Sequence, residues 1–505
     1  MEKNTILAFV LSIAFLLFWW TVVAPPQKQP VASAPAAVAR EHTTPQQTPV
    51  VTPQPSAEAS PVAMAPEKEI IIDAPAYRAV FSSRGAAIKH WFIKEKNESV
   101  VDLVMNEAFP PMATLAPLSY TIASLSERSV TFRAKTPAGY TVEKTYALSD
   151  EFLHTVSFTV TPPAKVSQPL LLDFGWGPGL GTDVHGQKEN LRSTRIIGLP
   201  LSKEKSLQKF KPGEFPAADY QWAGIDNQYF LAAVIPSAEA GITNISVRKS
   251  DKKAYPAVLF SRAIEPGNQP VSFSFSLFIG PKDYTSLSAM GLRLERAVDF
   301  GTFGFLGKIA LGSLNFLNSY THNYGWAIVV LTLLLQIIVF PLTVKSFKAQ
   351  ADMKRLQPVI KELQERYKED PKRLNVEMLN IYKNHKVNPL GGCLPMLLQL
   401  PIFWALFTTL RNAYELRGAP WLLWITDLSA RDPYYVLPVV MGVGMLLQQK
   451  LAASTIDPAQ ARMMMMMPIV FTFMFLNFPA GLVLYWLTNS IVSIVQQYVI
   501  MNKKQ

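Results

Sequence analysis

Two polar side chains lie at the centre of a long apolar segment, where they could form hydrogen bonds inside a membrane. Residues 324–343 form a segment of about 20 residues, which as a helix matches the thickness of the hydrocarbon layer of a bilayer. Its interior is apolar except for Thr332 and Gln336, which are four residues apart and share one helix face. An amide without a partner in hydrocarbon costs roughly 2–7 kcal/mol. Gln336 must therefore face protein, water or a guest segment.

Two interpretations of this pair fit the segment. The simpler one is a hydrogen bond between helices, worth about 0.6 kcal/mol on average. The other is a hydrated groove that receives polar residues of a passing chain. Both interpretations rest on hydrogen bonding alone. We expect no catalytic residue, no metal and no cofactor in this protein.

The charge of the chain is concentrated in the segment that follows. The whole chain has a formal charge of +11, and 49% of its residues are hydrophobic. Residues 344–387 hold eleven Lys or Arg against six Asp or Glu, a net charge of +5. Because apolar segments flank these residues on both sides, the positive-inside rule places them in the cytoplasm. The basic charge thus indicates membrane topology and gives no reason to expect DNA as a partner.

The fold that best accounts for these features is a multi-pass α-helical membrane protein with six transmembrane helices, an extracytoplasmic β-sandwich domain and a cytoplasmic helical hairpin. The predicted spans are about 6–23, 324–343, 394–411, 434–450, 465–479 and 481–499, which puts both termini in the cytoplasm. The predicted parts are a transmembrane anchor (1–24), a disordered Pro/Ala-rich linker (25–67), the β-sandwich (68–285), a connecting region (286–322), a five-helix core (323–501) that includes the hairpin (344–387), and a tail (502–505).

Alternation of apolar and polar residues predicts the β-sandwich. Residues 156–160 and 271–277 alternate, so each strand would bury one face. Cys393 is the only cysteine, so no intramolecular disulfide can form and the domain must be stabilised by its own core. The domain shows no nucleophile elbow, phosphate loop or zinc-helix motif, and we interpret the lone Asp and His of residues 182–186 as parts of a turn.

An amphipathic helix is predicted at residues 303–322. Apolar residues recur there every three or four positions, and Lys308 and Asn315 lie on another face. Next to a span, such a helix is expected to lie in the membrane interface; the alternative is a soluble helix packed on the sandwich. We expect the sandwich to be joined to the membrane core only through this helix and the linker.

The basic segment predicts a hairpin of two helices. Apolar residues from Met353 to Tyr367 step by three and four, residues 369–371 break the helix, and a shorter apolar seam runs from Leu374 to Ile381. The hairpin is either simply solvated or uses its basic side chains to contact ribosomal RNA, a targeting receptor or anionic lipid. The candidate contact residues are Lys361, Arg366, Lys368, Lys372 and Arg373.

Several long motifs follow the hairpin in a fixed order. They are Asn388-Pro-Leu-Gly-Gly-Cys-Leu-Pro-Met-Leu-Leu-Gln-Leu-Pro-Ile-Phe403, Asp432-Pro-Tyr-Tyr-Val-Leu-Pro438, Phe478-Pro-Ala-Gly-Leu-Val-Leu-Tyr485 and Gln496-Gln497. With these motifs, residues 300–501 resemble the YidC/Oxa-type membrane protein insertases. The large domain before them resembles the form that this family takes in Gram-negative inner membranes, where the domain is periplasmic.

The resemblance implies a non-enzymatic insertase and chaperone of the inner membrane. Its expected partners are nascent membrane proteins, the lipid bilayer, the Sec translocon, and the ribosome or a targeting receptor. It also implies a hydrophilic groove, open to the cytoplasm and the lipid, along which a hydrophobic segment slides without nucleotide hydrolysis. By position, the groove residues are Thr332, Gln336, Gln399, Tyr485, Trp486 and Asn489.

This sequence departs from the family pattern at one groove position. Members of the family usually carry an arginine where Gln336 stands, so attraction of acidic substrate flanks by a fixed charge is in doubt here. For Tyr485 and Trp486, ordinary packing aromatics are the alternative to a groove role. The alternative function for the whole chain is a transporter or channel, which predicts charge pairs at mid-membrane and often an internal repeat. The predicted spans show neither, which favours the insertase.

Overall fold

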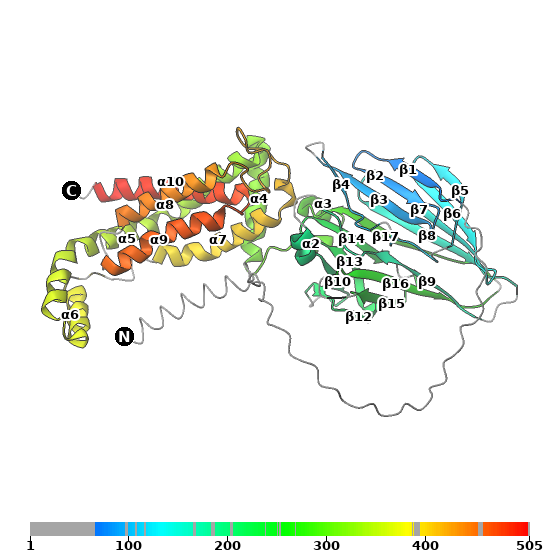
Figure 1. Cartoon of the computed structure of the whole chain (residues 1–505), viewed down its shortest axis with the longest axis horizontal. Coiled ribbons are helices and arrows are strands. Elements are labelled where there is room, and N and C mark those ends of the chain that lie inside the picture. The colour runs from blue at the N-terminus through cyan, green and yellow to red at the C-terminus, as the bar shows by residue number, and fades with distance from the viewer. Residues whose placement is uncertain are drawn as a thin grey trace, which may run out of the picture. The chain divides into compact units, whose positions relative to one another are not determined.

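The computed structural model describes most of the chain from residue 66 onward (Figure 1). The predicted anchor (1–24), nearly all of the linker (25–67), residues 183–186 of the predicted turn and Cys393 lie outside the described residues. The described residues are 66–95, 99–106, 109–115, 118–164, 168–182, 187–202, 206–237, 239–249, 251, 254–267, 269–385, 387, 394–452 and 458–502.

A nine-stranded antiparallel sheet forms the largest layer of the β-domain. The predicted segments 156–160 and 271–277 belong to two of its neighbouring strands, and Phe158 lies opposite Phe273 with a ring-centroid distance of 4.9 Å. In spatial order the strands are β11 (Gln208–Lys209), β10 (Arg195–Pro200), β13 (Tyr220–Asp226), β14 (Phe230–Pro236), β17 (Val271–Pro281), β8 (Leu153–Thr161), β7 (Thr141–Ala147), β6 (Ser129–Lys135) and β5 (Thr121–Ser126).

Two four-stranded antiparallel sheets pack on one face of this layer. Phe81 of the first sheet contacts Tyr146 of β7, and Phe174 of the second contacts Phe275 of β17, both at centroid distances of 4.7 Å. The predicted β-sandwich is therefore confirmed, with one long sheet facing two shorter ones across a single apolar core. The short sheets are β1 (Glu69–Asp73), β2 (Tyr77–Ser82), β3 (Ala87–Lys94) and β4 (Val100–Asp102), and β12 (Gly213–Pro216), β15 (Asn244–Arg248), β16 (Ala257–Ile264) and β9 (Leu170–Trp176).

Helices make up the second half of the chain, and five of them coincide with the five spans predicted after residue 323. By length and composition, α5 and the stretch Ala480–Ile500 of α10 could each cross a membrane, whereas Val436–Lys450 and Met466–Phe475 are shorter apolar stretches. The number of spans therefore stays a prediction. The helices are α2 (Gln187–Ser193), α3 (Tyr284–Ala289), α4 (Gly304–Thr321), α5 (Tyr324–Arg366), α6 (Pro371–Asn384), α7 (Leu394–Asn412), α8 (Val436–Ala452), α9 (Pro458–Phe475) and α10 (Ala480–Asn502).

The first span and the first arm of the hairpin are one helix. α5 has 43 residues and continues through Pro341 and Pro358. It ends at Arg366, just before the predicted break at residues 369–371. The carboxylate of Asp370 accepts a hydrogen bond from the Arg373 backbone N–H at 3.1 Å and so caps α6, which begins with Pro371. The hairpin therefore extends directly from the membrane helix, with no loop between them.

The predicted interfacial helix, α4, contacts both the β-domain and the core. It buries Ala310 and Leu314 within the helical core, while Phe305 and Phe316 are exposed. On its polar side, Asn315 donates a 3.4 Å hydrogen bond to Thr285 Oγ1. The polar face packs toward the β-domain, as the second alternative predicts. The placement of the exposed apolar face in a membrane interface stays a prediction.

The expectation that only the linker and one helix join the sandwich to the core is wrong. A second apolar cluster contains Trp222 and Phe278 of the nine-stranded sheet together with residues of α4, α5, α7 and α10. Gln228 Nε2 donates to the Arg411 carbonyl at 2.8 Å, and Arg417 forms a buried ion pair with Glu95. The last two residues are 322 positions apart, so no local pattern in the sequence could reveal their contact.

Candidate functional site

One face of α5 carries a row of buried or half-buried polar side chains. Asn323 caps the start of this helix: its side chain accepts hydrogen bonds from the backbone N–H groups of Gly325 and Trp326 at 2.9 and 3.2 Å. The row runs toward the hairpin in steps of three, four and seven residues, which keep its members on one face. Its members are Thr332, Gln336, Thr343, Ser346 and Gln350.

The predicted pair at the start of this row is satisfied inside the protein. Thr332 donates its hydroxyl to the carbonyl of Ile328 in its own helix at 2.7 Å. Gln336 Nε2 donates to Oδ1 of Asn489 on α10. Both side chains are buried. The interhelical hydrogen bond that the sequence left as one of two interpretations is therefore present.

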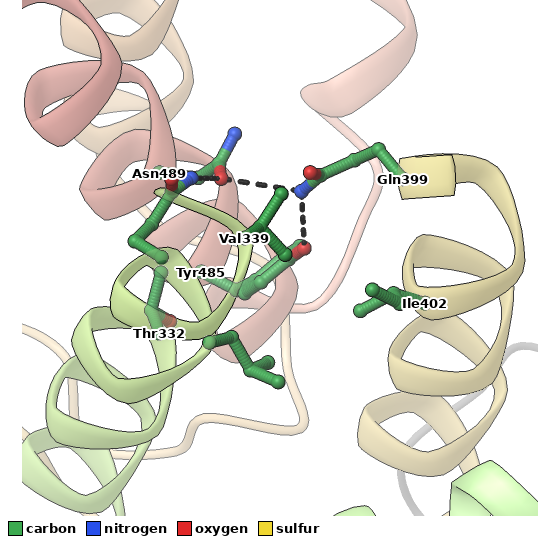
Figure 2. A pocket seen from close by; sticks show the side chains of 8 residues that line it. Thr332, Val339, Gln399, Ile402, Tyr485 and Asn489 are labelled. Atoms are coloured by element: carbon green, nitrogen blue, oxygen red, sulfur yellow. Dashed lines mark hydrogen bonds between the residues drawn. The ribbon is translucent and has the colours of Figure 1, made fainter. Parts of the chain in front are cut away.

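A third helix completes the cluster (Figure 2). Gln399 of α7 donates to Asn489 Oδ1 at 3.3 Å and to the Tyr485 hydroxyl at 3.2 Å. Asn489 thus accepts hydrogen bonds from the amides of two different helices. We name Gln336, Gln399, Tyr485 and Asn489 the amide cluster.

A small cavity lies among the amide cluster, Thr332 and the apolar side chains of Leu335, Val339 and Ile402 (Figure 2). Its volume is about 10 Å³, which admits about one water molecule. None of the described residues that line it is charged. The structure thus brings together five of the six predicted groove residues around a nearly closed polar cavity. Sequence analysis missed the apolar lining residues, although Leu335 and Val339 follow Thr332 at helical spacing.

The sixth predicted residue, Trp486, does not line this cavity. Its ring packs edge-on against Phe403 at a centroid distance of 4.8 Å and contacts Phe475 at 5.3 Å. The structure thus places it among packing aromatics, which was the alternative interpretation for this residue.

Further amide oxygens are buried along α10, between the cluster and the C-terminal end of this helix. The Oε1 atoms of Gln496 and Gln497 are buried and have no hydrogen-bond partner among the described residues. Gln496 follows Asn489 by seven residues and so lies on nearly the same helix face. A buried acceptor without a partner costs about 1–3 kcal/mol. These positions extend the polar surface between α5 and α10, and their spacing was a signal that sequence analysis did not use.

The five predicted contact residues of the hairpin are all exposed. Arg366 forms a 3.1 Å ion pair with Glu362 one turn away, and the Arg373 guanidinium lies 5.5 Å from the centroid of the Tyr367 ring. The seam residues Leu363 and Leu374 are half-buried. The hairpin therefore presents its basic side chains to the surroundings while its apolar seam faces inward.

Buried charges are found in the β-domain. The fully buried Asp226 accepts hydrogen bonds from Arg195 at 2.7 and 3.1 Å and from Lys282 at 3.0 Å. Burial lowers the pKa of the Lys282 ammonium, and the nearby Asp226 carboxylate opposes this shift. Lys144 is also fully buried and donates to the carbonyls of Ala86 and Met112 and to Thr114 Oγ1.

Comparison with known proteins gives full-length relatives. Residues 316–505 match the family described as 60Kd inner membrane protein, and residues 101–310 match the family described as YidC periplasmic domain. The membrane protein insertase YidC of Endomicrobium trichonymphae is 44% identical over 516 residues, which cover 100% of this chain and 98% of the relative. The YidC of Syntrophus aciditrophicus is 37% identical over 548 residues, which cover 99% of each chain.

A solved structure also matches. The crystal structure of an active YidC insertase with its first transmembrane domain resolved covers 86% of this chain and 93% of its own, at 20% identity and a TM-score of 0.40. The full-length relatives and the two adjoining family matches agree with each other in order and extent. This chain belongs to the YidC family of membrane protein insertases, which are inner-membrane proteins with a periplasmic domain.

Proposed function

We propose that this insertase receives the polar residues of a nascent membrane protein on the polar surface between α5, α7 and α10. The observation that carries the proposal is the row of buried polar side chains, from Thr332 to Gln350, on a helix that is otherwise apolar around its centre. Burial of polar groups in such a helix costs free energy and is typical of functional sites in membrane proteins.

The hydrogen bonds that Gln399 makes in the amide cluster are of a kind that a guest can replace. Gln399 divides its donor group between Asn489 and Tyr485 at 3.3 and 3.2 Å, which are long hydrogen bonds. A polar group of a guest chain can accept from Gln399 in their place, so opening the cavity exchanges hydrogen bonds and leaves few of them unmade. Burial of the guest's apolar segment in lipid then drives insertion, at about 25 cal/mol per Å².

The cavity contains no fixed charge, so the proposed groove works through polarity. An amide both donates and accepts hydrogen bonds, whereas a guanidinium only donates. Gln336 can therefore serve acidic, basic and neutral flanks of a substrate alike. Trp486 would support the groove from outside by packing against α7 and α9.

The finer topology and the partners belong to this proposal. The predicted six spans place both termini and the hairpin in the cytoplasm. The basic residues Lys361, Arg366, Lys368, Lys372 and Arg373 would then meet ribosomal RNA or a targeting receptor, and the insertase would work alone or with the Sec translocon.

Thiol labelling from the cytoplasmic side tests the groove. Single cysteines at Thr332, Gln336 and Ser346, in a Cys393→Ser background, are labelled in membrane vesicles with an impermeant thiol reagent. Matched controls are cysteines at Leu333 and Ile337, which are exposed on the outer surface of the same helix. We expect faster labelling along the row, fastest at Ser346, which lies nearest to the hairpin. Labelling along the row no faster than at Leu333 would refute a hydrated groove.

A further inference from the structure

A second cavity lies between α4, α5 and α7, and nearly all of its lining is apolar. Its volume is about 570 Å³, and among the described residues that line it Ser313 alone has a polar side chain. Leu306 and Phe316 of α4, Leu334 and Ile338 of α5, and Ile402 of α7 contribute to its walls. On α5 its lining runs from Leu331 to Ile338, at the level of the amide cluster.

This cavity opens to the outside of the helical core. Ile309, Phe316, Leu334 and Ile338 line it and are also strongly exposed, at 50%, 62%, 46% and 71% of their surface. In an inner-membrane protein of this family, such an apolar surface faces the bilayer. The cavity is thus continuous with the lipid-facing surface of α5 and lies beneath α4, the helix predicted to lie in the membrane interface.

The position of the cavity decides between possible occupants. Its walls open on the exposed apolar surface of the helices, so acyl chains of the bilayer reach it without any rearrangement of the protein. An acyl chain is a single file of methylenes and enters the cavity lengthwise. Its fully apolar surface also matches a lining with a single hydroxyl.

We propose that this cavity binds one acyl chain of a membrane phospholipid. Leu335 and Ile402 line both this cavity and the amide-cluster cavity, so these two side chains form part of the wall between the bound chain and the polar site. The lipid then completes the apolar wall of the polar cavity on the side of α4. The site is independent of the groove proposed above, because it requires neither water access nor a substrate.

Gly312 offers a way to fill the cavity without disturbing its walls. It lines the cavity, and a Cβ placed there would meet nothing within 4 Å. Gly312→Phe should therefore occupy the space of the lipid chain. Gly304→Phe is the matched control, because it adds the same side chain to the same helix away from the cavity, where the added Cβ meets only Phe300 at 3.5 Å.

The test uses the full chain in vesicles of phosphatidylethanolamine and phosphatidylglycerol that contain a phospholipid with a photoreactive group near the end of one acyl chain. After irradiation, lipid adducts are located by mass spectrometry of peptides. We expect adducts at Phe316 and Leu334 to fall at least fivefold in Gly312→Phe and to stay unchanged in Gly304→Phe. Adducts at Ile337, which is exposed outside the cavity, should be equal in all three proteins and serve as the folding control.

A second measurement does not depend on the glycine variant. A photoreactive amino acid replaces Phe316 in the otherwise unchanged chain, and the mass of its adduct identifies the occupant. A phospholipid adduct supports the proposal. Adducts to another segment of this chain, to a second copy or to a substrate would overturn it, as would equal lipid adducts at Phe316 and Leu334 in the parent chain and Gly312→Phe.

Discussion

The ion cluster around Asp226 in the β-domain and the amide cluster in the helical core bury polar groups in different ways. In the β-domain, Asp226 is a full charge held by two cationic side chains, and Lys144 has three acceptors around its ammonium. In the core, the polar groups at the site are uncharged amides and hydroxyls, and Asn489 Oδ1 is shared between two donors. The first arrangement leaves nothing for a ligand to replace, whereas in the second the hydrogen bonds of Gln399 are long, at 3.2 and 3.3 Å.

Because of this difference, we expect substitutions at the two places to affect different properties of the protein, stability at one and activity at the other. A buried charge with a complete set of partners is strongly destabilising to break, because the remaining charges stay buried without compensation. A hydrogen bond between neutral groups in a membrane protein is worth about 0.6 kcal/mol on average. Substitutions in the β-domain should therefore act mainly on folding, and substitutions in the amide cluster mainly on insertion.

The largest effect is expected at Asp226. Asp226→Ala leaves Arg195 and Lys282 without their buried counter-ion, and the free energy of unfolding should fall by about 3–5 kcal/mol. Urea unfolding of the full chain in detergent, followed by tryptophan fluorescence, measures this loss. Asp73→Ala removes an exposed partner of both Arg78 and Lys94 and should cost about 1 kcal/mol or less. Equal losses in the two variants would contradict the larger contribution expected for the buried Asp226 than for the exposed Asp73.

His154 should make the stability of the β-domain depend on pH. It is buried between the rings of Tyr77 and Trp91, and burial lowers its pKa from 6.5 to about 3. Because the unfolded chain takes up this proton first, stability is fully present above pH 6.5 and is lost as the pH falls toward 3. At pH 4 the loss from this residue should be about 3 kcal/mol relative to pH 7.

Two variants isolate this contribution. His154→Leu should abolish that part of the pH dependence, whereas His322→Gln changes an exposed histidine and should keep it. Urea unfolding of the full chain at pH 7 and pH 4 gives the comparison. If the wild type and His154→Leu lost equal stability between these two pH values, the neutral buried state of His154 would be refuted.

In the amide cluster, a substitution should change insertion more than the free energy of unfolding. Gln336→Leu removes a donor from the polar cavity and should lower insertion about tenfold, the equivalent of about 1.4 kcal/mol, which lies within the cost of an unmet buried partner. Its free energy of unfolding should change by less than about 1 kcal/mol. Gln336→Arg keeps a donor and should insert within about twofold of the wild type. Protease protection of a single-span substrate in proteoliposomes measures insertion; equal damage from leucine and arginine would show that Gln336 is only a packing amide.

The smallest effect is expected at the hairpin tip. Reversal of both charges, Lys372→Glu with Arg373→Glu, should reduce co-sedimentation with translating ribosomes about two- to fivefold at low salt, and the difference should disappear as salt screens the charges. Leu363→Asp in the seam should instead abolish function at any salt, because it disrupts the hairpin. Unchanged ribosome capture after the charge reversal would leave the basic tip as a topology signal alone.

Periodic patterns in the sequence predicted the helices and strands. They did not predict contacts between residues that are far apart in the chain. Alternation identified the neighbouring strands β8 and β17, and apolar runs located α5, α7, α8, α9 and α10. The pair Glu95–Arg417 could not be predicted, because each residue is an ordinary charged side chain in its own surroundings. For the site, two residues of α5 stood out against an apolar background. Thr343, Ser346 and Gln350 did not, because they lie where the sequence becomes polar on every face.

Because α5 is one continuous helix, it fixes the rotation of the hairpin about the helix axis relative to the residues of the site. A helix of 43 residues is about 65 Å long, so roughly half of it extends beyond one hydrocarbon thickness of about 30 Å. Each residue in it advances the direction of the side chains by about 100°. One residue inserted between Gln350 and Leu356 would therefore rotate the hairpin by more than a quarter turn about the helix axis, while every side chain of the site stayed in place. The direction in which the hairpin meets its partners is thus set by the number of residues in α5.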